Sequence, residues 1–100
     1  MVSAVVLMNI ERGAINEVAE RLVELEGVRE VYSVAGRYDL VALLRVPDNR
    51  AMAELVTEQI LAIPRIEKTE TLLAFKAYPR RDMEAMFSVG FEGEERVSEE

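Results

Sequence analysis

The spacing of apolar residues changes along this chain, and each type of spacing predicts a different secondary-structure element. Stretches 14–25 and 50–63 carry apolar residues at helical intervals and are expected to be amphipathic helices. Apolar runs bounded by Gly or Pro are typical of strands, and they occupy residues 2–10, 28–35, 40–46 and 66–78. Gly27 is expected to end the first helix, and Asp48 or Asn49 to cap the second.

The two halves of the chain repeat the same pattern. A shift of 38 residues places Ala4–Val6 on Ala42–Leu44 and Val28 on Ile66, so the chain consists of two strand–helix–strand units. Right-handed crossovers in both units predict a ferredoxin-like βαββαβ fold of the α+β class. Its four-stranded antiparallel sheet has strand order 4-1-3-2, with two helices on one face.

The central strands are apolar on both faces, although two helices can cover only one face of the sheet. Val5 and Leu7 point away from Val6, and Val41 and Leu43 form the matching set in the third strand. Leaving about six such side chains in water would forgo on the order of 10 kcal/mol. A patch of that size typically marks an interface. We therefore predict a dimer of the α/β-barrel type, in which two open sheet faces pack together; the alternative is that the C-terminal segment covers the face.

Composition narrows the function classes. The chain has 100 residues, the size of one domain, and contains no Cys or His. Nucleophilic Cys–His and Ser–His–Asp catalysis is therefore excluded, and we expect no metal site and no cofactor. The net charge of −7 argues against direct contact with nucleic acid. No segment is long enough to span a bilayer or resembles a signal peptide, and the lack of Cys fits a reducing cytoplasm.

A polar turn, Gly36-Arg37-Tyr38-Asp39, separates the second and third strands. It has a structural interpretation as a hairpin turn, in which Gly36 takes a positive φ and Asp39 hydrogen-bonds nearby backbone. It also has a functional interpretation. Exposed amides around Gly36 could receive a carboxylate, with Asp39 holding an ammonium group and Tyr38 forming a wall of the pocket. Both interpretations stay open at this point.

Two threonines interrupt the last strand. Thr69 and Thr71 are two residues apart and therefore share one face of an edge strand. Hydroxyls on an edge strand need no special explanation, yet this pair could also hydrogen-bond a common small ligand. The strand order places them at the edge opposite the strand that leads to Gly36. A pocket that uses both the threonines and the turn would therefore combine two subunits.

The C-terminal residues differ from the rest of the chain. We expect a domain over residues 1–78 and an extension over residues 79–100. Met83, Met86 and Phe87 lie at helical spacing, which predicts a short helix that packs on a neighbouring subunit or binds a peptide. The final Glu-rich stretch is expected to be a mobile acidic tail without an assigned function.

Two segments, "ERGAINEVAERLVELEGVREVYSVAGRYDLVALLRV" and "IPRIEKTETLLAFK", resemble the effector-binding (RAM) domain of the leucine-responsive regulatory protein (Lrp/AsnC) family. The resemblance covers about Val5 to Lys76. It implies a βαββαβ fold, dimers formed through the sheets, and further assembly, often into octamers. It also implies an amino acid or related metabolite bound between dimers. The ligand-binding positions that it implies are Gly36, Arg37, Tyr38, Asp39, Thr69 and Thr71.

Full-length members of this family carry an N-terminal helix-turn-helix, whereas this chain begins at the first strand and resembles the stand-alone form. We therefore expect an oligomeric amino-acid-binding module without catalysis, which acts on full-length regulators instead of binding DNA itself. One alternative is a dimeric α/β-barrel enzyme, such as a small monooxygenase or isomerase. That class generally needs ionisable groups inside the sheet cavity, and the expected inner faces are aliphatic. A second alternative is a structural subunit that binds nothing small.

Overall fold

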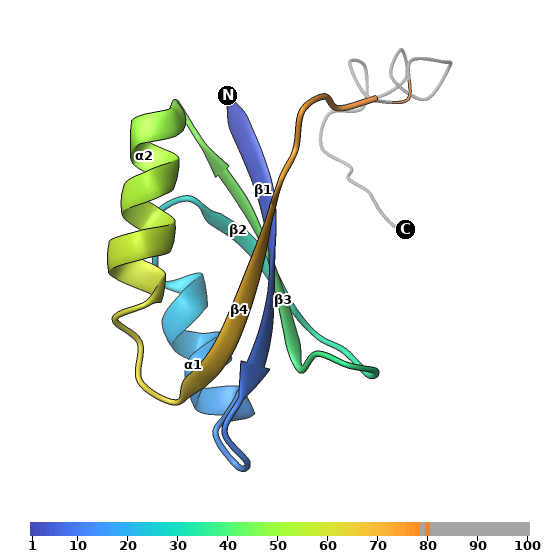
Figure 1. Cartoon of the computed structure of the whole chain (residues 1–100), viewed down its shortest axis with the longest axis vertical. Helices are drawn as coiled ribbons and strands as arrows, with labels where there is room; N and C mark the ends of the chain where they lie inside the picture. Colours follow the sequence, from blue (N-terminus) through green and yellow to red (C-terminus); the bar gives the residue numbers. More distant parts are fainter. Residues whose placement is uncertain (79, 81–100) are drawn as a thin grey trace, which may run out of the picture.

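The computed structural model describes residues 1–78 and 80, which form a sheet of four strands with the helices on one side (Figure 1). In chain order the elements are β1 (Val2–Ile10), α1 (Ile15–Val23), β2 (Val28–Ser33), β3 (Leu40–Val46), α2 (Asn49–Glu54), the π-helical segment η1 (Leu55–Ile60) and β4 (Ile66–Leu73).

The strands lie in the order β2-β3-β1-β4, and all three neighbouring pairs are antiparallel. This order is the predicted 4-1-3-2 arrangement read from the other edge, so the ferredoxin-like α+β fold is confirmed. β1 and β3 are central, and β2 and β4 are the edges. The helix and acidic tail expected beyond residue 80 lie outside the described residues, so the proposed boundary between domain and extension stays a prediction.

Gly27 does not end the first helix as expected. α1 ends at Val23, and Gly27 follows it directly before β2 with a φ of +101°. A Cβ atom at this position would lie 2.8 Å from Cγ1 of Val46 and 2.9 Å from Cδ2 of Leu55. Glycine is therefore needed here because the backbone passes close to the core and has a conformation that side chains disfavour.

The second helix begins as predicted but changes its hydrogen bonding halfway. Asp48 is its N-cap, since its Oδ1 accepts a hydrogen bond of 2.8 Å from the backbone N–H of Ala51. From Leu55 the helix is π-helical and ends at Ile60, three residues before the expected end. The hydroxyl of Thr57 donates to the carbonyl of Ala53 at 2.6 Å, which is the acceptor that an α-helix would offer to the Thr57 N–H.

Both edge strands are shorter than expected. β2 ends at Ser33, and β4 ends at Leu73 where the chain runs past the beginning of β1. One more hydrogen bond of 2.9 Å joins the Ala74 N–H to the carbonyl of Ser3. Beyond it Phe75 is 99 % exposed.

The core lies between the sheet and the helices. The strands contribute alternate residues to it, and α1, α2 and η1 supply the opposite layer. Every buried residue in the described part of the chain is apolar. The core residues are Ala4, Val6, Met8, Ile10, Ala14, Val18, Leu22, Leu40, Ala42, Leu44, Val46, Met52, Leu55, Ile60 and Ile63.

The other face of the sheet, which we call the open face, carries no helix formed by the described residues (Figure 1). Its central residues Val5, Leu7, Val41 and Leu43 are half-buried by one another, and Leu72 of β4 lies opposite Val5 and is 48 % exposed. The predicted two-sided apolar pattern is therefore confirmed, while pairing of two open faces stays a prediction. Within the described residues, no helix is both long and apolar enough to cross a membrane.

Candidate functional site

The turn Gly36–Asp39 lies at one end of the open face and is attached to β1. The Asp39 N–H donates to the carbonyl of Met8 at 2.8 Å, and the Val34 N–H donates to the carbonyl of Asp39 at 3.1 Å. Gly36 has a φ of +117°, as the hairpin interpretation predicted, and no atom lies within 4 Å of the position that a Cβ would take. The backbone around Gly36 is therefore accessible to a small molecule.

Asp39 has a defined structural role. Its Oδ2 accepts a hydrogen bond of 2.8 Å from the backbone N–H of Ile10, the last residue of β1. The side chain is half-buried, so this N–H would lack a partner without the carboxylate. Oδ1 makes no hydrogen bond or ion pair with the described residues. One carboxylate oxygen therefore stabilises β1, and the other is available for the predicted ammonium contact.

Asn9 fixes the middle of the turn. Its Nδ2 donates to the carbonyl of Arg37 at 2.8 Å, whereas the Arg37 side chain is exposed. Asn9 is not among the site residues predicted from the sequence. The sequence does contain a feature that could have identified Asn9, because its amide interrupts an apolar strand on the same face as Val5 and Leu7.

Tyr38 connects the turn to the opposite half of the sheet. Its hydroxyl donates to Oε1 of Glu70 in β4, and this hydrogen bond raises the pKa of Tyr38 above its usual value. Glu70 lies opposite Leu7 and therefore on the open face. Tyr38 thus reaches across β1 to the far edge strand within one chain. This contact joins the turn to β4 within one chain, whereas the expectation of two subunits concerned Thr69 and Thr71.

Thr69 and Thr71 lie on the face opposite the Tyr38–Glu70 contact. They pair with Met8 and Val6, whose side chains point toward the helices. Thr69 is half-buried and Thr71 is exposed, and they share one face as predicted. The single chain does not bring the threonines to the turn, so a joint pocket between subunits stays a prediction.

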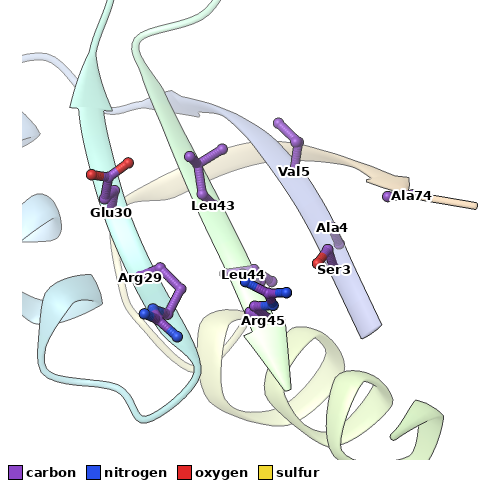
Figure 2. A pocket seen from close by; sticks show the side chains of 9 residues that line it. All are labelled: Ser3, Ala4, Val5, Arg29, Glu30, Leu43, Leu44, Arg45 and Ala74. Atoms are coloured by element: carbon purple, nitrogen blue, oxygen red, sulfur yellow. The ribbon is translucent and has the colours of Figure 1, made fainter. Parts of the chain in front are cut away.

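A hollow of about 420 Å³ lies at the other end of the open face (Figure 2). It takes residues from all four strands or their ends, and two of them, Arg29 and Arg45, are cationic. This pair was not predicted from the sequence. Arg45 could have been identified from the sequence, because it follows Val41 and Leu43 at alternate positions of β3 and is charged where they are aliphatic. The hollow is lined by Ser3, Ala4, Val5, Arg29, Glu30, Leu43, Leu44, Arg45 and Ala74.

Glu30 at the edge of this hollow has a partner on its own strand. Its Oε1 accepts a hydrogen bond of 2.6 Å from the hydroxyl of Tyr32, which raises the pKa of that tyrosine. Elsewhere in the described part of the chain, no three His, Cys, Asp or Glu residues are placed to hold a metal ion together.

Comparison with known proteins gives consistent matches. The family model described as the Lrp/AsnC ligand binding domain matches residues 3–83. The HTH-type transcriptional regulator FL11 of Pyrococcus abyssi is 32% identical over 75 residues, which are 75% of this chain and 49% of that protein. The chain thus spans about half the length of the curated relatives named FL11 that it matches.

Two solved structures cover most of both chains. TTHA0845 from Thermus thermophilus is 48% identical, with a TM-score of 0.76 over 80% of this chain and 100% of that chain. The hypothetical protein PHS023 from Pyrococcus horikoshii is 33% identical, with a TM-score of 0.73 over 78% of this chain and 94% of that chain. Sequence and fold therefore agree on the same relationship.

Proposed function

We propose that this chain, which belongs to the Lrp/AsnC ligand-binding domain family, is an oligomeric module that senses an amino acid or a related small metabolite in the cytoplasm. The family and the regulator FL11 support an effector-binding role in transcription regulation. The amino-acid ligand, its place between subunits and the oligomer are the parts that we propose.

The observation that carries the proposal is the apolar open face. Val5, Leu7, Val41 and Leu43 form a continuous aliphatic surface across the two central strands, and Leu72 extends it. Burial of such side chains contributes about 1.5–3 kcal/mol each, which favours association of two copies through this face. The resulting homodimers would assemble further, and octamers are the expected form.

The turn Gly36–Asp39 is the proposed ligand contact. The accessible backbone around Gly36 would receive the ligand carboxylate, and Oδ1 of Asp39 would accept from its ammonium group. Arg37 and Tyr38 would form the adjoining walls. Thr69 and Thr71 would reach the ligand only from another subunit, because the turn Gly36–Asp39 of the same chain lies at the open face and the two threonines lie on the opposite face of the sheet.

Regulation would pass through a partner that contains a DNA-binding domain. The net charge of −7 disfavours direct contact with the phosphate backbone, so full-length regulators of the same family are the proposed partners. A non-catalytic role agrees with the name of the curated relative FL11, which is a transcriptional regulator.

Calorimetric titration of the assembled protein with each of the twenty amino acids tests the proposal. At least one amino acid should bind, and the oligomer mass should change in its presence. The absence of heat with all twenty, in a protein shown to be oligomeric, would contradict the proposal.

Asp39 offers a matched pair of variants for the same titration. Asp39→Ala removes both the β1 contact and the charge, whereas Asp39→Asn keeps an acceptor oxygen for the Ile10 N–H. We expect Asp39→Asn to remain folded and oligomeric but to lose binding at least about tenfold, since a charged hydrogen bond is replaced by a neutral one. Unchanged affinity in Asp39→Asn would assign Asp39 a structural role alone.

A further inference from the structure

The chain leaves an aromatic side chain almost entirely in water directly after β4. Phe75 is 99 % exposed, and Leu72 and Leu73 before it are 48 % and 50 % exposed. The ring of Tyr78 has Nζ of Lys76 at 5.2 Å from its centroid, whereas Phe75 has no such contact with the described residues. Exposed apolar residues that follow one another in this way typically mark an interaction surface.

Residues 74–78, which we call the arm, lead away from the sheet on its uncovered side. Figure 1 shows them turning toward the side that carries no helix formed by the described residues. The Ala74 N–H donates to the carbonyl of Ser3 at 2.9 Å, which fixes the beginning of the arm beside β1. Ala74 lines the hollow shown in Figure 2, but Phe75 does not. A single chain therefore carries the arm at the rim of the hollow without placing its aromatic ring inside.

The hollow contains two guanidinium groups that lack partners in the described part of the chain. Arg29 and Arg45 are exposed and form no ion pair or side-chain hydrogen bond there. Arg29 is the additional residue of a bulge, because the register of β2 and β3 shifts between Val28 and Glu30. Arg45 lies opposite Ser3 at the end of β3. Figure 2 shows both guanidinium groups at the lower end of the hollow.

The rest of the hollow suits an aromatic ring. Val5 and Leu43 of the two central strands form an aliphatic wall, and the hollow has a volume of about 420 Å³. Its carboxylate, that of Glu30, accepts the hydroxyl of Tyr32. A guanidinium group is attracted to the face of an aromatic ring, and burial of the ring removes a large apolar surface from water. The apolar wall and the two guanidinium groups together therefore match the chemistry of a phenyl ring.

Two open faces can pair about a two-fold axis in two ways, because such an interface uses the same patch on both copies. An axis along the strands places β4 of one copy over β2 of the other, so that each arm reaches the hollow of its partner. An axis across the strands exchanges the two ends of the sheet, so that each arm reaches the end with Lys68 and Glu70 instead. This second arrangement would place apolar rings against charged side chains. The composition of the arm therefore favours the axis along the strands.

We propose that Phe75 of each copy occupies the hollow of the other copy, between the aliphatic wall and the two arginines. This inference rests on the proposed pairing of open faces and adds the orientation of the pair and the residue that anchors it. The hollow is continuous with the open face through Val5 and Leu43, so the ring extends the same interface. The two arms are exchanged reciprocally, and the hollow of each copy is complete only when the other is present.

Sedimentation equilibrium of the full chain and its variants over a concentration series tests the anchor. Phe75→Ala should raise the dissociation constant of the pair at least about 100-fold, because two buried rings are lost from each dimer. Phe75→Leu keeps an apolar side chain and should have a smaller effect. Arg45→Gln should raise the constant about fivefold or more, since two cation–π contacts are lost from each pair. Leu61→Ala is the matched control, because Leu61 is 56 % exposed in the helical layer and should not affect the pair.

The chain contains no Cys, so introduced thiols test the orientation directly. A tagged chain with Phe75→Cys is mixed with an untagged chain with Ser3→Cys and treated with a short bis-maleimide. Ser3 lines the hollow, so covalent heterodimers should form. Lys68→Cys lies at the other end of the open face and should give little product with Phe75→Cys. Circular dichroism checks that all variants are folded.

The other outcomes would overturn the proposal in distinguishable ways. A monomeric wild type would contradict the pairing of open faces and the exchange of arms together. A wild-type dimer that is unaffected by Phe75→Ala, or is weakened equally by Leu61→Ala, would contradict the exchange of arms alone. Preferential cross-linking of Phe75→Cys to Lys68→Cys would show that the ends of the sheet are exchanged. Cross-linking within one chain that carries both Phe75→Cys and Ser3→Cys would place the arm in the hollow of its own chain.

Discussion

The central strands carry aliphatic side chains on both faces of the sheet, but the two sets are buried to different extents. Leu44 and Leu43 are neighbours in β3, and Leu44 is 2 % exposed beneath the helices whereas Leu43 is only half-buried on the open face. The same contrast separates Met8, which is fully buried, from Leu72, which is 48 % exposed. Hydrophobicity in a strand therefore shows that a side chain needs cover, but the topology decides whether the chain itself provides that cover.

Replacing the two neighbouring leucines tests this contrast most strongly. Leu44→Ala should lower the free energy of unfolding by about 2–5 kcal/mol, because it leaves a cavity in the core. Leu43→Ala should cost clearly less when urea denaturation is followed at concentrations too low for association. Equal losses in the two variants would show that the open face is already covered within one chain.

Two glycines provide the next comparison. Gly27→Ala should cost about 2–4 kcal/mol, since its Cβ would overlap Val46 and Leu55 and its φ is positive. Gly36→Ala also has a positive φ but has open space around it, so about 1 kcal/mol is expected. Thermal unfolding of both variants measures the difference, and a larger loss at Gly36 would be inconsistent with the packing described here.

Asp39→Ala should lower stability by about 1–2 kcal/mol, because the N–H of Ile10 loses its acceptor at the end of β1. Asp39→Asn should recover most of this loss. Urea denaturation of the two variants at neutral pH separates the contribution of the acceptor from that of the charge. Identical stabilities would mean that the hydrogen bond from Ile10 contributes nothing measurable.

The smallest expected effect concerns Tyr38 and pH. The hydrogen bond to Glu70 raises the pKa of Tyr38 in the folded state, so its contribution to stability is complete below the ordinary tyrosine pKa of about 10. That contribution is lost as the pH rises through the higher folded-state value. The stability of Tyr38→Phe should therefore fall less than that of the wild type in alkaline solution. Parallel pH profiles of the two proteins would contradict the contact.

Much of the fold follows from the spacing of apolar residues and from the repeat of 38 residues. The repeat even relates Gly27 and Arg65, two of the four described residues with a positive φ, and each of them precedes an edge strand. It does not predict strand register. Val31 pairs with Ala42, but the equivalent Thr69 pairs with Met8 instead of Ala4, a difference of four residues. A shift by four residues leaves every side chain on the same face of the strand, because side chains alternate with a period of two. The apolar pattern therefore contains no information about this shift in register.

The candidate site was less accessible to prediction. The turn Gly36–Asp39 stood out because polar residues interrupt two apolar runs. Its partners Asn9 and Glu70 did not, since each is a single polar residue in a strand and is distant in sequence. Likewise, Arg29 and Arg45 share a hollow only because a bulge and the strand order bring them together. Contacts of this kind depend on the three-dimensional arrangement of strands.

Sedimentation equilibrium of the full chain at micromolar concentration tests the pairing of open faces most directly, using two leucine variants. Leu72 lies on the open face and is 48 % exposed, whereas Leu61 follows η1 and is 56 % exposed. We predict a wild-type mass at least twice the chain mass of 11.3 kDa, a monomer for Leu72→Glu, and an unchanged oligomer for Leu61→Glu. A monomeric wild type, or equal masses for the two variants, would contradict the pairing of open faces.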